Sequence, residues 1–176
     1  MGKNRPNKAF TLIEVLFVII ILTATTGLAI ANYRGFTTTK SIETELLKFN
    51  KAVEYASQLA RAESTQVCSS QTITVRPTVY LLELYQVNNQ YKAYRITAAC
   101  ANNGILNITP TPINYLLEKG VFTQRPFNTL RFEIKTGKII ENITNACYKI
   151  QYNNITKSLV FNNKYGGAEI KSENCN

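Results

Sequence analysis

The sequence contains no histidine, no tryptophan and no aspartate, and all 11 of its acidic residues are glutamate. Without histidine the chain has no imidazole base, no imidazole metal ligand and no Ser-His-Asp triad. The glutamates are scattered without the spacing of a metal site, and no glycine-rich phosphate loop is present. We therefore expect a protein that is not an enzyme, with no catalytic residue, no cofactor and no metal.

Charged residues are also few, at 18 % of the chain against 45 % apolar residues, which excludes a largely disordered chain. Part of the net charge of +9 comes from Lys3, Arg5 and Lys8 at the N-terminus. The remaining 17 basic and 11 acidic residues leave a charge of +6. A basic protein can favour nucleic acid or anionic lipid, but a composition rich in asparagine and lysine is the better explanation of the excess, because charge alone is weak evidence.

Cysteine is scarce, and Cys68, Cys100, Cys147 and Cys175 form no close C-x-x-C pair. This spacing disfavours a zinc ribbon. Four widely spaced cysteines in an exported domain predict two disulfides with three connectivities open, whereas in a reducing compartment they would be buried thiols. We favour Cys147–Cys175, because that disulfide would fix the C-terminal tail, and sequential pairing would then join Cys68 to Cys100.

Apolar residues are concentrated near the N-terminus. Residues 10–31 carry one charge, Glu14, and are followed by Tyr33 and Arg34. As a helix this run would extend roughly 33 Å, enough to cross a bilayer core. The positive charges before it would stay in the cytoplasm and place the rest of the chain outside. An ordinary signal peptide is the alternative, but the run is long for one.

The presence of a charged residue, Glu14, within this apolar run needs an explanation. A carboxylate inside an apolar helix costs free energy unless something neutralises it. The helix dipole favours a carboxylate near the N-terminus, but it does not require one at this depth. A positive partner would neutralise Glu14, and the freed amino terminus of a neighbouring copy could supply that charge.

The segment around Glu14, Lys8-Ala9-Phe10-Thr11-Leu12-Ile13-Glu14-Val15-Leu16, resembles the processing motif of type IV prepilins and type II secretion pseudopilins. In that family a membrane-bound prepilin peptidase cuts before the phenylalanine and methylates the new amino terminus. The resemblance implies cleavage between Ala9, where the family usually has glycine, and Phe10, which would become N-methylated. It also implies that Glu14 pairs with the terminal amine of an adjacent subunit during assembly.

Beyond this segment the periodicity changes twice. Residues 36–64 place an apolar side chain every three or four positions, which predicts that the helix continues as an amphipathic half. Short β-rich runs separated by turn signals then follow at residues 71–75, 79–87, 91–99, 130–134, 138–143, 146–152 and 158–161. The pattern predicts an α+β fold, in which a long N-terminal helix packs on one antiparallel sheet of about six to eight strands.

The resemblance identifies this architecture as the pilin fold. It implies a cytoplasmic leader at residues 1–9, a transmembrane half of the helix at 10–35, an amphipathic half at 36–64 and an exported β-rich head at 65–176. Residues 45–66 and the tail at 159–167 are also similar, more weakly, to GspH/FimT-like minor pilins.

The function implied by the resemblance is assembly. After cleavage and methylation, a minor pilin or minor pseudopilin would join a type IV pilus or the pseudopilus of a type II secretion system. Its partners would be other pilin or pseudopilin subunits, the prepilin peptidase and the assembly platform of the inner membrane. The chain would cross that membrane once and place its head in the periplasm.

A receptor is the alternative function, namely a minor pilin whose basic head binds DNA in competence or a surface. The candidate residues lie in the last third of the sequence, and they are Arg131, Lys135, Lys138, Lys149, Lys157 and Lys164. Phosphate binding needs these charges on one face, whereas solvated lysines on hairpin turns would be scattered. Their arrangement in space therefore distinguishes the two interpretations.

Overall fold

The computed structural model describes residues 11–62, 68–70, 73–75, 77–102, 105–108 and 112–171. The chain divides into two compact units, residues 1–37 and residues 38–176. Helix α1 (Leu12–Arg61) contributes its first half to one unit and its second half to the other. A long N-terminal helix is thus confirmed, and its predicted end near residue 64 lies outside the described residues.

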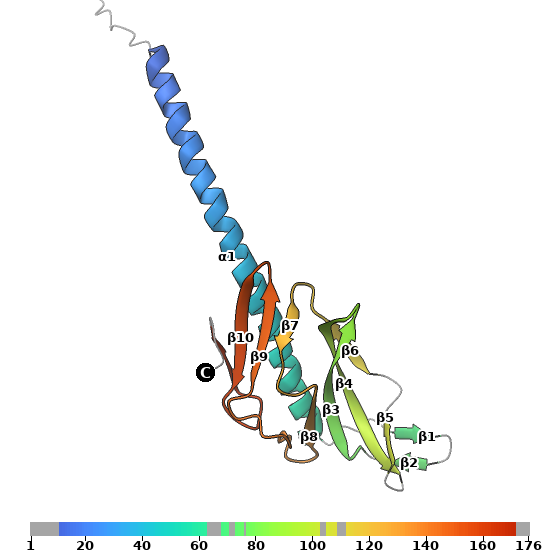
Figure 1. Ribbon diagram of the computed structural model, residues 1–176. Helices are drawn as coiled ribbons and strands as arrows, with labels where there is room; N and C mark the ends of the chain where they lie inside the picture. The colour runs from blue at the N-terminus through green and yellow to red at the C-terminus, as the bar shows by residue number, and fades with distance from the viewer. Residues whose placement is uncertain are drawn as a thin grey trace, which may run out of the picture. The chain divides into compact units, whose positions relative to one another are not determined.

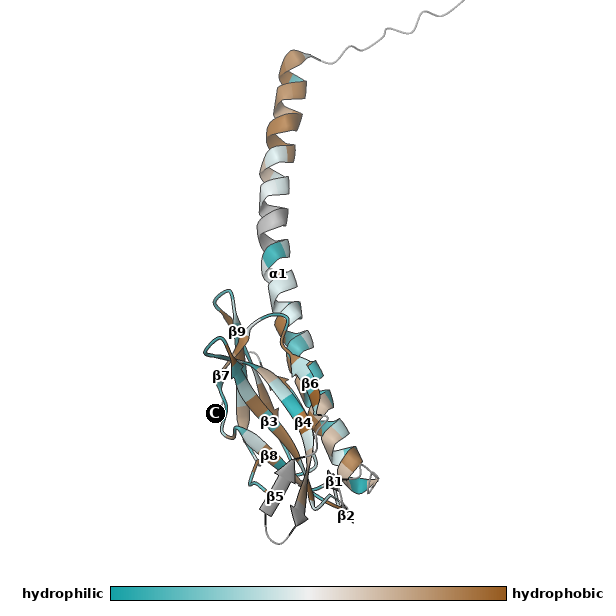
Figure 2. Cartoon of the chain, turned by 90° about the vertical axis from the view of Figure 1, so that its right-hand side faces the viewer, coloured by the Kyte–Doolittle hydropathy of each residue, from teal (hydrophilic) through white to brown (hydrophobic). Residues whose placement is uncertain are grey.

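The first half of α1 begins with a strongly apolar segment, which is brown in Figure 2. Among the described residues, no helix has both the length and the apolar character needed to cross a membrane. The transmembrane half expected at residues 10–35 therefore stays a prediction.

The second half of α1 is amphipathic, as its periodicity predicts. Its apolar stripe has an exposed fraction of 0 % at each of its main positions, Ile42, Leu46, Phe49, Val53, Ala56 and Ala60. These positions recur every three or four residues, so they share one helix face. That face forms part of the core of the unit at residues 38–176.

The strands that the structure describes after the helix form three antiparallel sheets (Figure 1). The first has the order β5-β4-β3-β8, with β6 also pairing with β4. Its strands are β3 (Val79–Val87), β4 (Gln90–Asn102), β5 (Ile105–Ile108), β6 (Ile113–Leu116) and β8 (Thr129–Glu133). The second has the order β11-β10-β9-β7. Its strands are β7 (Val121–Gln124), β9 (Cys147–Tyr152), β10 (Ile155–Phe161) and β11 (Ala168–Lys171). The third sheet pairs β1 (Cys68–Ser70) with β2 (Ile73–Val75). A helix followed by antiparallel sheets confirms the predicted α+β class.

The prediction of one sheet is wrong, because the described strands belong to three sheets. The strand expected at residues 138–143 is reduced to one bridge, between Ile139 and Phe132. Around this bridge the N–H of Glu133 donates to the carbonyl of Lys138, and the N–H of Ile140 donates to the carbonyl of Arg131, both at 2.8 Å. The pairing goes no further, because the N–H of Ile143 donates to the carbonyl of Glu141 in a local turn. Strands β6 and β7 were not predicted, since each has only four residues, too few to show a clear alternation.

Phe49 connects the helix to both larger sheets. Its ring centroid lies 5.2 Å from that of Tyr94 in β4, 5.1 Å from that of Phe122 in β7 and 5.2 Å from that of Tyr148 in β9. The hydroxyl of Tyr148 donates to the carbonyl of Phe127 at 3.2 Å, and burial raises the pKa of this tyrosine. One helix side chain therefore occupies the centre of an aromatic cluster, where edge-to-face pairs are favourable.

Two tight turns made of asparagine pairs close the hairpins β3–β4 and β9–β10. Asn88 and Asn89 have φ of 53° and 59°, and Asn153 and Asn154 have φ of 48° and 63°. Positive φ at both central positions is the backbone of the type I′ turn, which suits two-residue hairpins, and asparagine tolerates it. Both turns agree with the turn signals in the sequence.

Candidate functional site

The predicted processing position, Ala9 and Phe10, lies outside the described residues, which begin at Thr11. The predicted assembly residue Glu14 is described, and it lies in the first turn of α1.

Thr11 and Glu14 form a reciprocal cap on the start of α1. The Glu14 carboxylate accepts hydrogen bonds from the backbone N–H of Thr11 at 2.9 Å and from its hydroxyl at 3.0 Å. In return, the Glu14 N–H donates to the Thr11 hydroxyl at 3.3 Å. This is the capping box of the pattern Thr-x-x-Glu, which satisfies two free backbone donors at a helix start. The pattern is visible in the sequence and gives Glu14 a second role that the sequence interpretation missed.

The side chains that follow Glu14 are apolar and exposed in the single chain. Exposed fractions range from 46 % at Val15 to 80 % at Leu12 over the large apolar residues between Leu12 and Leu22. Exposed apolar area on this scale marks a surface that is covered by lipid or by another protein. Glu14 thus lies among side chains that have no cover within the described part of the chain, and both hydrogen bonds to its carboxylate come from the neutral residue Thr11.

The basic candidates divide in space, and Lys135, Lys138 and Lys164 lie near the C-terminal end of α1. The N–H of Lys135 donates to the carbonyl of Ala60 at 3.0 Å, so this turn caps the helix. Lys138 lies just past the same turn, and the carbonyl of Lys164 accepts a hydrogen bond from the next residue, Ile139. Three segments far apart in the sequence therefore meet at this end of the helix.

Arg61, in the last turn of α1, belongs to the same group. Its Nε donates to the carbonyl of Thr136 at 3.1 Å, and its guanidinium carbon lies 5.4 Å from the ring centroid of Tyr165. We call the surface formed by Arg61, Lys135, Lys138, Lys164 and Tyr165 the basic end. In the sequence, the only local indication that Arg61 could belong to this surface is its position in the last turn of a helix, where a cation is favourable.

Gly137 explains why this turn lies so close to the helix. Its φ is +65°, and a Cβ there would lie 2.5 Å from the carbonyl oxygen of Ser57. The Ser57 hydroxyl donates to the Gly137 carbonyl at 2.8 Å. Only glycine combines this backbone angle with such a close approach.

The lysines of the basic end differ in their ion pairs from two of the other residues that were predicted to bind DNA. Within the described part of the chain, Lys135, Lys138 and Lys164 form no ion pair. In contrast, Arg131 Nε lies 2.6 Å from Glu141 Oε1, and Lys157 Nζ lies 3.3 Å from Glu43 Oε1.

The remaining candidate, Lys149, lies in β9 opposite Ser158 of β10 and Gln124 of β7. Glu43, the partner of Lys157, also accepts a hydrogen bond from Lys40. These hydrogen bonds lower the pKa of Glu43, with the larger effect from Lys40 and a smaller one from Lys157. The structure thus brings together three of the six predicted DNA-binding residues and engages two others, Arg131 and Lys157, in ion pairs.

Cys100 and Cys147 are both disulfide-bonded, and no described cysteine is free. The side chain of Cys68 and the whole of Cys175 lie outside the described residues, so the pairing stays a prediction. Among the described residues, no group of three or more histidine, cysteine or acidic side chains is arranged to hold a metal ion.

No protein-family model, no curated protein and no solved structure matches this chain. Its function is therefore inferred from its own residues.

Proposed function

We propose that this chain is a pilin-like subunit of the inner membrane that assembles into a type IV pilus or a type II secretion pseudopilus. Residues 1–9 would be removed as a leader, and the new terminus at Phe10 would be methylated. Residues 10–35 would anchor the chain, and the unit at residues 38–176 would contain the exported head.

The observation that carries this proposal is the carboxylate of Glu14 at the start of an exposed apolar helix. In a single chain the carboxylate receives hydrogen bonds from Thr11, which leave its charge uncompensated. In lipid an uncompensated charge is costly, so the subunit is biased to find a cation. The terminal amine of a neighbouring subunit would give a charge-assisted hydrogen bond at this point.

The proposal is tested by the intact and N-terminal mass of the protein purified from membranes. We expect a mature chain that begins at Phe10 and carries one added methyl group. A chain that begins at Met1 would show that the leader is retained, and one that begins near residue 30 would show ordinary secretion. Either of those two results would contradict the assembly mechanism.

The second candidate function is DNA binding, and the basic end favours it. Its three lysines, which form no ion pair with any described residue, meet an arginine and the exposed ring of Tyr165 at one end of α1. Such a group can neutralise several phosphates, and an exposed ring can stack on a base. The paired residues Arg131 and Lys157 are not part of this group.

We expect the full chain in detergent to shift a DNA duplex in a gel at low salt. A triple variant with Lys135→Asn, Lys138→Gln and Lys164→Gln should bind more weakly, and its salt slope should fall by about 0.9 for each phosphate that is no longer neutralised. Asparagine at position 135 keeps the left-handed backbone, where φ is 73°. Lys119→Gln, at an exposed lysine elsewhere, is the matched control. Absence of a shift at low salt would exclude DNA as the ligand.

A further inference from the structure

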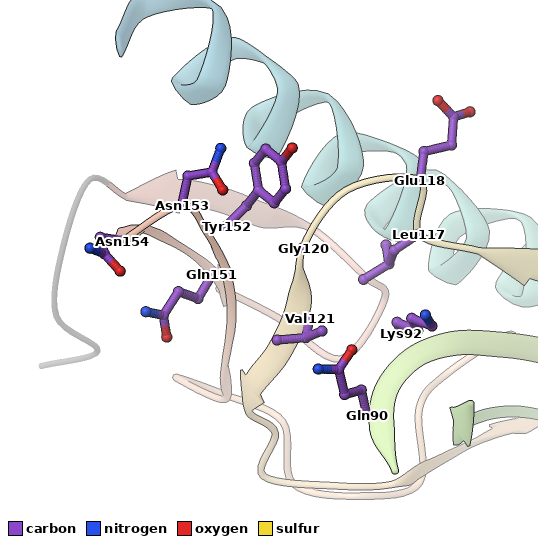
Figure 3. Close-up of a pocket in the computed structure, with 10 residues that line it drawn as sticks. All are labelled: Gln90, Lys92, Leu117, Glu118, Gly120, Val121, Gln151, Tyr152, Asn153 and Asn154. Atoms are coloured by element: carbon purple, nitrogen blue, oxygen red, sulfur yellow. The ribbon is translucent and has the colours of Figure 1, made fainter. Parts of the chain in front are cut away.

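A polar cleft of about 510 Å³ opens in the unit at residues 38–176, at the side of β7 (Figure 3). It is formed by the start of β4, the bend before β7 and the tip of the β9–β10 hairpin. Amide side chains, one lysine, one glutamate and a few apolar groups line it. The volume is in the range of small-molecule sites, about 300–1,000 Å³.

We propose that this cleft binds a neutral carbohydrate, presented as a short oligosaccharide. The proposal does not depend on filament assembly or on the basic end. Its first support is the supply of amide groups. The side chains of Gln90, Gln151, Asn153 and Asn154 make no hydrogen bond within the described part of the chain.

Each amide offers two donors and one acceptor, which complements a sugar hydroxyl that both donates and accepts. The turn accounts for asparagine at positions 153 and 154, because their φ values are positive. It does not account for Gln90 and Gln151, which come from two different strands and line the same cleft.

The charge of the cleft selects a neutral ligand. Its two ionised side chains, Lys92 and Glu118, have opposite signs. The Glu118 carboxylate is already held by Lys48, at 3.1 Å from Nζ. Lys48 also lies 3.0 Å from Glu45, so Lys92, Lys48, Glu118 and Glu45 together carry no net charge. Phosphate or sulfate groups therefore gain little there. The cleft therefore differs in chemistry from the basic end.

Apolar surface is available for the C–H face of a sugar ring. Tyr152, whose ring is half-buried, and Leu117 lie on opposite sides of the bend at Gly120 (Figure 3). The amide of Gln90 points toward the apolar side chain of Val121. Small-molecule sites commonly combine such apolar walls with a few polar groups that fix orientation. An aromatic ring with a polar edge provides both.

The cleft is preformed because Gly120 holds its wall against β9. The φ of Gly120 is +87°, and a Cβ there would lie 2.7 Å from Cγ2 of Ile150 and 2.9 Å from the carbonyl oxygen of Gln151. Only glycine allows the bend to lie this close to the strand. A wall fixed in this way loses little conformational entropy when a ligand binds.

The test applies the full chain in detergent to an array of maltotriose, cellotriose, chitotriose and mannotriose, with a heparin oligosaccharide as the acidic probe. We expect at least one neutral sugar to bind, with binding insensitive to salt. The double variant Gln90→Ala and Gln151→Ala should weaken its Kd by about tenfold, as expected for the loss of one or two hydrogen bonds.

Two further variants separate binding from folding. Asn154→Gly keeps the positive φ and removes only the amide, so it should weaken binding while circular dichroism stays unchanged. Gln58→Ala, at an exposed glutamine on α1, should bind as the parent does. The proposal is overturned if no neutral sugar binds, if only heparin binds and is released by salt, or if the double variant binds as tightly as the parent.

Discussion

Replacement of Glu14 by valine should leave the protein inserted in the membrane and lower its incorporation into filaments by about tenfold or more. The reason is the loss of the charge-assisted hydrogen bond that we propose between Glu14 and a neighbour's amine, since such a bond is worth about 1.5–3 kcal/mol. Valine also removes the cost of a charge in lipid, so retention in the membrane should increase. The measurement compares the amount of subunit in sheared filaments with the amount in the membrane fraction.

The capping box requires two control variants, because Glu14→Val also removes a helix cap. Glu14→Gln retains an acceptor for the Thr11 N–H but has no charge, and it should lose incorporation as valine does. Thr11→Val removes the hydroxyl partner and keeps the carboxylate, and it should incorporate almost normally. If Glu14→Gln assembled like the parent, the carboxylate would serve as a cap alone.

The second large effect is expected from Phe49→Ala, which should destabilise the unit at residues 38–176 by about 3–5 kcal/mol. Phe49 is 0 % exposed, and its ring contacts the rings of Tyr94, Phe122 and Tyr148. Its removal would leave a cavity at the point where the helix meets both sheets. The loss corresponds to a decrease in Tm of about 10–20 °C for a unit of this size.

Unfolding can be followed by near-ultraviolet circular dichroism of tyrosine, because the chain has 10 tyrosines and no tryptophan. Leu47→Ala is the matched control on the same helix, since Leu47 is 50 % exposed and its loss should cost about 0.5 kcal/mol or less. An equal decrease in Tm for both variants would contradict a central role for Phe49.

The helix could be predicted because its pattern is local. The stripe that includes Ile42, Leu46 and Phe49 repeats at helical spacing, and a side chain's place in that repeat fixes which face it occupies. The asparagine turns were predictable for the same reason, since the backbone angle is a property of two adjacent residues. Glu14 was identified from its isolation among apolar residues, but its cap was missed although Thr-x-x-Glu is equally local.

The division into sheets could not be predicted, because pairing partners are distant in sequence. Residues 138–143 have the composition of a strand, yet they pair with β8 only around Ile139, and nothing near residue 139 indicates where this pairing stops. The basic end is hidden in the same way, since Arg61 joins Lys135 only through the capping of α1. The polar cleft likewise needs Gln90 and Gln151 to come together from separate sheets.

The position of Phe49 also has a consequence for the order in which the chain folds during synthesis. Phe49 is made early, whereas Tyr148, which it contacts, lies in β9 near the other end of the sequence. Contacts between such distant segments form slowly, because a long loop must close before they are made. Tyr94 and Phe122 are made before β9 and can cover part of the apolar stripe of α1 earlier. A chain stopped before β9 would still lack Tyr148, one of the three rings that surround Phe49.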